Sequence, residues 1–321
     1  MMAVVPAIIA TLVAWLALAL LRRPGCLPVD HPNDRSLHRS PVPRGAGMAI
    51  WVGAIAGTVW LPQPQTWLAP LLLVIAVSLW DDQTGVPVAM RLAAQIAAAF
   101  AWIGFSTPLP QALLAIAAIV WIANLYNFMD GSDGLAAAMS IIGYGAYAAA
   151  AWRAGAAEAP VMLAVAGATV PFFVLNRPPA RVFLGDVGAV PLGFLAAVLG
   201  IGGWQAHWWP AWFPLLVFLP FIADATVTLV RRLISGARVW EAHRDHHYQR
   251  LVRLGLGHTG TFALYTALML GTAVSALAAL IRAPDAGDVL LVLWATVLLL
   301  LFAGIGYYWS LQNKGLGESK G

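Results

Sequence analysis

Apolar runs of about 20 residues, the length that crosses a lipid bilayer as an α-helix, follow one another along this chain. Turn residues such as Pro62-Gln63-Pro64 separate them, and only 10% of the residues are charged, against about 25% in soluble domains. The runs lie near residues 3–21, 45–62, 66–80, 90–106, 109–126, 134–152, 159–176, 187–205, 209–230, 260–281 and 288–310. This pattern predicts an all-α integral membrane protein, a polytopic bundle of about 11 transmembrane helices that forms a single domain over residues 1–321.

Lys and Arg residues lie almost entirely on one side of the predicted membrane. Sixteen of the 18 occur in the odd-numbered loops or the C-terminal tail, and the other two are Arg153 and Arg282. Because cytoplasmic loops carry the excess of positive charge, we expect the N-terminus outside and the C-terminus in the cytoplasm. The basic residues behind the net charge of +4 are therefore distributed as expected for a membrane protein, and they do not indicate a nucleic-acid partner.

Six aspartates lie at or near the ends of these apolar runs, where a carboxylate is costly. Between residues 60 and 235 the only other acidic residue is Glu158. A charged side chain in the bilayer costs about 2.5 to 3.5 kcal/mol on insertion scales, and those that occur are usually functional. Since all six fall on the predicted cytoplasmic side, we expect one polar site assembled from several helices. They are Asp81, Asp82, Asp130, Asp133, Asp186 and Asp224.

Asp81 and Asp82 end the run 66–80 as adjacent carboxylates. Two like charges side by side need a cation, a proton or an Arg partner. Mg²⁺ takes carboxylate oxygens, usually one or two together with substrate phosphate and water, so the pair is a candidate metal site. The alternative is a solvated helix end followed by a turn.

The segment 124–135 is the most specific in the chain, with two Asn, two Asp and two Gly between apolar runs. Asn127, Asp130 and Asp133 supply acceptors, and the glycines let the backbone approach a ligand closely. The alternative is an Asp-Gly turn between helices. Two Asp-Gly pairs are redundant for one turn, so the segment favours a binding site.

Asp186 opens the run 187–205 within Gly185-Asp186-Val187-Gly188, after Asn176 and the basic residues Arg177 and Arg181. A helix N-terminus favours an anion or phosphate, although the same carboxylate also suits an ordinary N-cap.

Asp224, late in the run 209–230, indicates either function or an internal ion pair, and the sequence leaves both open.

Three histidines, His243, His246 and His247, lie in the long loop after residue 230 with Arg244 between them. If this loop is helical, the three share one face. Zinc binding is one interpretation and a basic segment on anionic lipid is another. The mixture with Arg favours a cationic grip on phosphates.

Together these segments resemble the polyprenyl-phosphate N-acetylhexosamine-1-phosphate transferases, the WecA/MraY superfamily of glycosyltransferase family 4, over about residues 20 to 260. The peptidoglycan-precursor branch carries three consecutive histidines where this chain has His243-Arg-Asp-His246-His247, so the resemblance is closest to the WecA/WbpL-like branch. The matching pieces are Asp30-x-Pro-Asn33, Pro43-Arg44-Gly45-x-Gly47, Asp81-Asp82, Asn127-Phe-Met-Asp130-Gly-x-Asp133-Gly, Phe183-x-Gly-Asp186-x-Gly and His243-Arg-x-His246-His247.

The resemblance implies an enzyme that moves an N-acetylhexosamine 1-phosphate from a UDP-sugar to undecaprenyl phosphate and releases UMP. It implies an inner (cytoplasmic) membrane location in a bacterium, an active site facing the cytoplasm and a part in starting O-antigen or other cell-envelope polysaccharide synthesis. Mg²⁺ is the expected cofactor, with Mn²⁺ as an alternative. The catalytic loops are expected near residues 22–44, 81–91, 127–134, 177–187 and 231–258.

The resemblance also implies roles for single residues. Asp186 is the first expected metal ligand, with Asp82 nearby, and Asp81 is the candidate base; an aspartyl-phosphate intermediate is the alternative mechanism. The expected catalytic set is Asp81, Asp82, Asp130, Asp133, His243, His246 and His247. The expected substrate-binding set is Asn127, Phe183, which would stack on uracil, Arg44, Arg181, Asn176 and Arg244.

A second class of function stays open at this stage. A membrane transporter or lipid carrier also retains intramembrane Asp residues, for proton coupling. Transporters place polar groups near the membrane midplane and reach both faces, whereas the polar groups here lie on the cytoplasmic side. The enzyme is therefore favoured, with the identity of the sugar and the presence of a homodimer left open.

Overall fold

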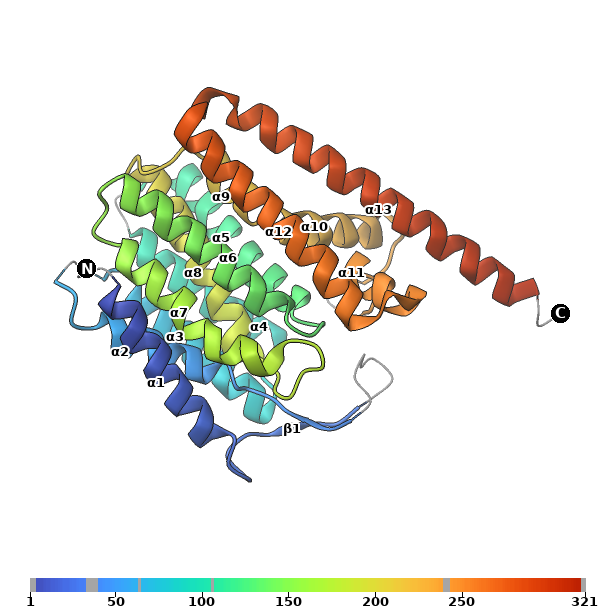
Figure 1. The fold of residues 1–321 in the computed structure, drawn as a ribbon, viewed down its shortest axis with the longest axis horizontal. Coiled ribbons are helices and arrows are strands. Elements are labelled where there is room, and N and C mark those ends of the chain that lie inside the picture. Colours follow the sequence, from blue (N-terminus) through green and yellow to red (C-terminus); the bar gives the residue numbers. More distant parts are fainter. Residues whose placement is uncertain (1–3, 33–39, 63–64, 105–106, 239–242, 319–321) are drawn as a thin grey trace.

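The chain is a bundle of α-helices in a computed structural model that describes residues 4–32, 40–62, 65–104, 107–238 and 243–318 (Figure 1). Two short strands, β1 (Val29–Asp30) and β2 (Val42–Pro43), pair antiparallel within the first loop. The helices are α1 (Val5–Leu21), α2 (Met48–Thr58), α3 (Leu68–Thr84), α4 (Val88–Ile103), α5 (Leu109–Met129), α6 (Leu135–Arg153), α7 (Ala159–Asn176), α8 (Asp186–Gln205), α9 (Trp212–Val217), α10 (Leu219–Ile234), α11 (His247–Leu251), α12 (Gly257–Arg282) and α13 (Gly287–Glu318). The predicted all-α class is confirmed.

Six helical stretches among the described residues are long and apolar enough to cross a membrane. They are Leu109–Met129, Leu135–Arg153, Ala159–Asn176, Asp186–Gln205, His247–Arg282 and Pro284–Gln312. Three shorter helices, α1, α2 and α4, are also apolar. At least one helix overlaps each predicted run, but the count of eleven spans and the orientation of the termini stay predictions.

The predicted run 209–230 is not one helix. Helix α9 ends at Val217, and α10 begins at Leu219 after Phe218, whose ψ of 10° departs from helical geometry. Pro220 follows immediately, and a proline has no N–H to donate to the preceding turn and clashes with its carbonyl. The prediction of one uninterrupted helix is therefore wrong at this point. Proline interrupts the helical hydrogen bonds, although the residues on both sides of the break are apolar.

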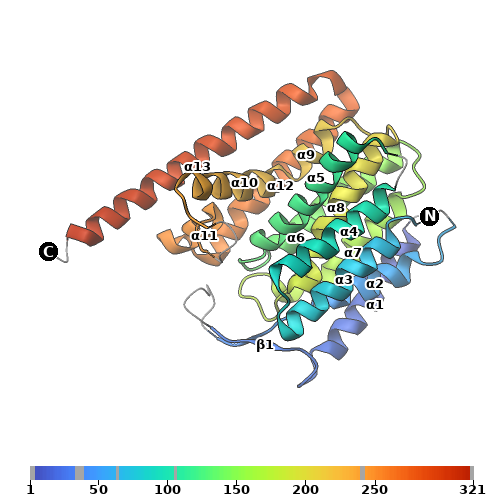
Figure 2. The same cartoon turned by 180° about the vertical axis from the view of Figure 1, so that it is seen from behind.

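Helix α8 forms the centre of the bundle. Every residue from Asp186 to Gly200 is buried, and α3 and α5 pack along it. Close packing is possible because Gly193 lies against the backbone of α5 at Ile122 and Ala123. Figure 2, seen from behind, places α1 and α2 on one side of this core and α13 on the other. The first turn of α8 is thereby held at a fixed place among its neighbours.

Helices α1 and α2 approach each other closely through small residues. A Cβ built on Gly53 would overlap the carbonyl oxygen of Ala10 and lie 2.6 Å from the Cβ of Ala14. Membrane helices commonly associate through such small residues, because close backbone approach supplies the van der Waals contact that apolar lipid does not.

Substitution of Gly53 by Ala should therefore destabilise the protein. We expect a loss of about 1–3 kcal/mol and a lower thermal midpoint in detergent, because the two backbones must separate. Gly145→Ala in α6 is the matched control, since nothing lies within 4 Å of its added Cβ. Equal midpoints for the two variants would contradict the close α1–α2 contact.

Candidate active site

One end of the bundle carries a cavity of about 1120 Å³. Its lining comes from α4, α5, the end of α7, the start of α8, α10, α11 and the start of α12, so segments distant in the sequence share one site. Nine of the predicted site residues line this cavity. They are Arg44, Asn127, Asp130, Asp133, Asn176, Phe183, Asp186, His243 and His246.

The cavity has a polar end and an apolar arm. The apolar arm runs between α4, α5 and α10, and Ile96, Leu113 and Leu233 on it are exposed at the surface of the bundle. The further apolar residues that line it are Val88, Leu92, Ile116, Ala117, Val120, Trp121, Leu229 and Val230. The cavity therefore joins a charged chamber to an apolar channel at the outer surface.

Asp186 lies at the centre of the polar end. Its Oδ1 accepts a hydrogen bond from Nη2 of Arg44 at 2.8 Å, and its Oδ2 accepts from Nη1 of Arg91 at 3.2 Å. The amide of Asn127 donates to Oδ2 at 3.3 Å. Two guanidinium groups thus compensate the charge of a carboxylate that α8 holds in a mostly buried position.

Asp82 lies behind Asp186 and outside the cavity lining. Its two oxygens accept hydrogen bonds from the backbone N–H groups of Asp186 and Val187, at 3.0 and 2.9 Å, and Arg44 lies 2.9 Å from Oδ1. The side chain is 1% exposed. Asp82 therefore caps the first turn of α8, where N–H groups have no intrahelical partner.

Gly185 makes this cap possible. Its φ of 75° lies in the left-handed region, and a Cβ there would be 2.6 Å from Oδ2 of Asp82 and 2.9 Å from the backbone of Gly45. Only glycine combines that backbone conformation with such close approach. The predicted motif around Asp186 is in this way a structural requirement of the turn as well as a site.

Asp81 also lies outside the cavity lining and faces Arg91. Its Oδ2 accepts from Nη1 of Arg91 at 2.7 Å, and its Oδ1 accepts from the backbone N–H of Val86 at 2.6 Å. Arg91, which lies at the end of the expected catalytic loop 81–91 but was assigned no role of its own, bridges Asp81 to Asp186 and lines the cavity. The requirement of the Asp81-Asp82 pair for a cationic partner was the signal that could have identified it.

The segment that follows α5 is tied to its neighbours by its own polar groups. Asp133 accepts a hydrogen bond from the backbone N–H of Ala180 at 3.0 Å, and Asn176 accepts one from the N–H of Gly134 at 3.0 Å. His258 of α12, at the end of the expected loop 231–258 but without an assigned role, lies 3.1 Å from the hydroxyl of Ser132 and lines the cavity. Asn176 and Asp133 therefore shape the wall that they line.

Asp130 faces the cavity just after the end of α5. Removal from water raises the pKa of Asp130 well above its usual range, and the charge of Asp186 raises it further; Arg44 opposes this shift, while Asp82 and Asp133 add to it. A carboxyl in this setting holds its proton more readily than an exposed one. The polar end consequently disfavours additional negative charge unless a cation accompanies it.

The three histidines do not share one helical face, because residues 243–246 are not helical. Helix α11 begins at His247, with His246 at its N-cap and His243 in the irregular chain before it. His243 and His246 line the cavity with rings stacked 4.9 Å apart between centroids. Burial and the neighbouring charges of His246 and Arg232 lower the pKa of His243 to about 4, so its ring is neutral near pH 7.

His247 points away from the cavity. Its Nδ1 lies 2.9 Å from Oδ1 of Asp224, and its ring stacks on Phe302 of α13 at 4.2 Å between centroids. Among the described residues no group of three or more His, Cys, Asp or Glu is placed to hold a metal ion, so the zinc interpretation gains no support.

Two predicted substrate-binding residues, Arg181 and Arg244, lie apart from the cavity. Arg181 is exposed and Arg244 is half-buried, and neither lines the cavity. Phe183 lines it and is half-buried. Asn33, part of the first matching motif, lies outside the described residues.

Substitution of Asp130 by Asn should change stability in a pH-dependent way. The folded-state pKa of Asp130 is raised, so the stability it contributes is present at low pH and is lost as the pH rises through that pKa. Asn does not ionise, and we expect the thermal midpoint of Asp130→Asn to exceed that of the wild type by an amount that grows with pH. Asp285→Asn, at an exposed residue near the opposite end of the bundle, is the control. A difference that does not vary with pH would contradict this account.

Comparison with known proteins places these residues in a family. Residues 65–203 match the model of "Glycosyl transferase family 4". A probable undecaprenyl-phosphate N-acetylglucosaminyl 1-phosphate transferase of Bacillus subtilis is 27% identical over 254 residues, which cover 72% of this chain and 71% of the relative. A decaprenyl-phosphate N-acetylglucosaminephosphotransferase of Mycobacterium tuberculosis is 29% identical over 72% of this chain and 70% of its own length.

A shorter match links the chain to the peptidoglycan branch. A phospho-N-acetylmuramoyl-pentapeptide-transferase of Enterococcus faecalis is 33% identical over 135 residues, 40% of each chain. The family match spans Asp81, Asp82, Asp130, Asp133 and Asp186, which gather in or directly against the cavity. The chain is thus similar to polyprenyl-phosphate N-acetylhexosamine-1-phosphate transferases of both branches, and these matches support its place in that superfamily.

Proposed function

We propose that this protein transfers an N-acetylhexosamine 1-phosphate from a UDP-sugar to undecaprenyl phosphate, releases UMP and so starts the synthesis of an O-antigen or another cell-envelope polysaccharide. The observation that carries the proposal is the shape of the cavity, a charged chamber continuous with an apolar arm that opens on the surface of the bundle. A water-soluble nucleotide-sugar suits the chamber, and a polyprenyl chain suits the arm. Both substrates then bring a phosphate to Arg44 and Arg91.

The charges of the chamber support transfer between two anions. Arg44 and Arg91 each bind Asp186, so an incoming phosphate finds two guanidinium groups already held in place. Arg recognises phosphate through paired N–H donors. His243 and His246 also line the cavity, where a ring nitrogen of each can donate to a phosphate oxygen.

Mg²⁺, or alternatively Mn²⁺, fits the donor groups of this chamber. Asp186 presents a carboxylate to the cavity, and Mg²⁺ commonly takes one or two carboxylates with substrate phosphate and water as its other ligands. The ion would offset the repulsion between the substrates and stabilise charge on the leaving phosphate. Asp82 as a second ligand stays a prediction, since both of its oxygens accept backbone N–H groups.

Asp81 is the proposed base for the lipid phosphate. Its carboxylate lies outside the cavity lining and is bound at 2.7 Å to Arg91, which lines the cavity. A phosphate that binds Arg91 competes with Asp81 and frees that carboxylate to accept a proton. The carboxylates of the cavity all lie at one end of the bundle, which favours this enzyme over a proton-coupled transporter.

The first test is UMP release from purified protein with undecaprenyl phosphate, Mg²⁺ and a panel of UDP-N-acetylhexosamines. We expect release with one donor and loss of release on addition of EDTA. Asp186→Asn should lower the rate by at least about 100-fold, because it removes a charge that both arginines and the metal require.

Asp285→Asn is the control, since it removes an exposed carboxylate far from the cavity and should retain the wild-type rate. Size-exclusion profiles of both variants establish that they are folded. Near-normal activity of Asp186→Asn would exclude Asp186 as the metal ligand. Absence of UMP release with every donor would contradict the proposed reaction.

A further inference from the structure

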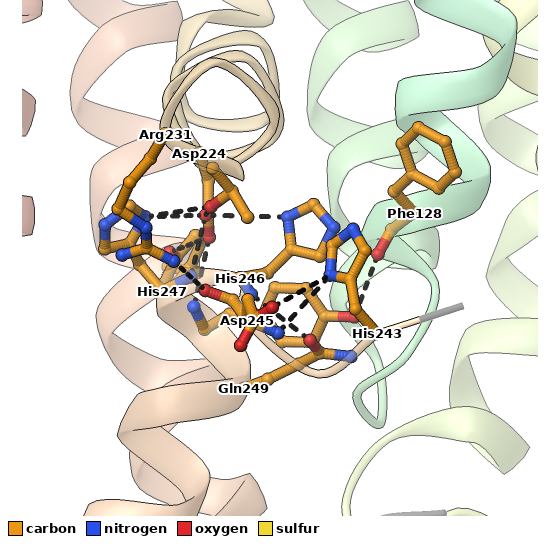
Figure 3. A network of polar contacts seen from close by, with 11 residues as sticks. Phe128, Asp224, Arg231, His243, Asp245, His246, His247 and Gln249 are labelled. Atoms are coloured by element: carbon orange, nitrogen blue, oxygen red, sulfur yellow. Dashed lines mark hydrogen bonds and ion pairs between the residues drawn. The ribbon is translucent and has the colours of Figure 1, made fainter. Parts of the chain in front are cut away.

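A buried carboxylate outside the cavity organises the histidine loop. Asp224 on α10 is 0% exposed and does not line the cavity. An ionised carboxylate in such a place is tolerated only when hydrogen-bond donors surround it. The donors around Asp224 come from α11 and α12 as well as from its own helix, as Figure 3 shows in part.

Both oxygens of Asp224 accept several hydrogen bonds. Oδ1 accepts from the backbone N–H of His247 at 2.8 Å, lies 2.9 Å from Nδ1 of the same residue and accepts from the hydroxyl of Thr228 at 3.2 Å. Oδ2 accepts from the backbone N–H of Tyr248 at 3.0 Å and the hydroxyl of Tyr265 at 2.5 Å. Asp224 therefore caps α11 and gives His247 a defined ring orientation.

This cap determines where His246 points. His246 is the residue before the capped turn, and its backbone N–H donates to Oε1 of Gln249 at 3.3 Å. With the backbone held on both sides, its ring lies in the cavity wall between His243 and Phe128, at 4.9 and 6.0 Å between centroids. Nδ1 of His246 stands 3.8 Å from Oδ1 of Asp224, beyond hydrogen-bond distance.

A second link runs from the same cap to the segment after α5. Tyr248, whose N–H is bound to Asp224, donates its hydroxyl to the carbonyl oxygen of Phe128 at 2.9 Å. A Cβ on Gly131 would overlap that hydroxyl, so glycine is needed for the segment to pass this close. The backbone that carries Asn127 and Asp130 is thereby connected to Asp224 through one side chain.

We propose that Asp224 and His247 form a buried positioning pair that acts on the reaction through His246 and does not touch substrate. The kinetic tests of this inference rest on the proposed function, whereas its structural test, hydrogen exchange without substrates, does not. It separates the two adjacent histidines by role, since His246 lies in the cavity and His247 holds the loop. It also resolves the two interpretations of Asp224 in favour of an internal polar pair that serves the site.

Asp224→Asn is the first variant. Asn replaces one carboxylate oxygen by an NH₂ group. This group cannot accept a hydrogen bond, so it would face the donors that now bond either Oδ1 or Oδ2 of Asp224. We expect kcat to fall by about tenfold or more while KM for the UDP-sugar changes by less than about threefold. Thr226→Val is the matched control, because this hydroxyl on the same helix has no hydrogen-bond partner among the described residues and should be dispensable.

A double-mutant cycle then tests whether Asp224 acts through His246. In the His246→Ala background, Asp224→Asn should cause little further loss, because the group that it positions is already gone. Losses that multiply in the double variant would show that Asp224 contributes independently of His246 and would overturn the proposal.

The His247 variants separate a positioning role from a catalytic one and serve if Asp224→Asn does not fold. His247→Asn puts an amide N–H near the place of Nδ1 and should retain activity within about threefold, whereas His247→Ala should lose about tenfold. Equal losses in both would indicate a direct chemical role for the ring and overturn the proposal.

Hydrogen exchange measured by mass spectrometry provides the structural test. In protein without substrates, Asp224→Asn should increase exchange in residues 243–251 and leave residues 159–176 of α7 unchanged; Thr226→Val should change neither. If the wild type releases no UMP with any donor, the proposed reaction fails while this measurement still tests the pair. Unchanged exchange in residues 243–251 would show that the pair does not position the loop.

Discussion

The contact between the carboxylate of Asp82 and the first turn of α8 is the interaction on which the site depends. It satisfies the backbone N–H groups of Asp186 and Val187 and brings the end of α3 to the start of the most buried helix in the bundle. The backbone of the first loop completes this junction, since Phe183 and Leu184 accept hydrogen bonds from the N–H groups of Ala46 and Gly47. Asp186 can face the cavity because the residues behind it are held in this way.

Charge compensation explains how so many carboxylates coexist at one end of an apolar bundle. Arg44 contacts both Asp82 and Asp186, and Arg91 contacts both Asp81 and Asp186. Among the described residues no guanidinium bonds Asp130 in this way, and burial together with the charge of Asp186 raises the pKa of Asp130. An arrangement with this balance favours ligands that bring anionic phosphates together with a cation.

Much of the helical architecture could be predicted because apolar runs of bilayer length are a local property of the chain. The gathering of Asp130, Asp133 and Asp186 also followed from the sequence, since the basic loops assigned all three to one side. The break at Phe218 was missed because the run 209–230 stays apolar through it, although Pro220 was a visible signal. Arg91 fell within the expected loop 81–91, but its role was missed because its second partner, Asp186, is 95 residues away in the chain.

The sequence alone determined the class of fold and the end of the bundle at which the polar residues meet, because hydropathy and charge act on each segment separately. Only the tertiary structure decided which carboxylates face the cavity. Asp186 and Asp130 line it, whereas Asp82 caps α8 and Asp224 caps α11. The same fold separates His246 from His247, adjacent in the sequence but directed to different partners. The direction of a side chain depends on the helix packed against it, and that packing is not encoded in any short segment.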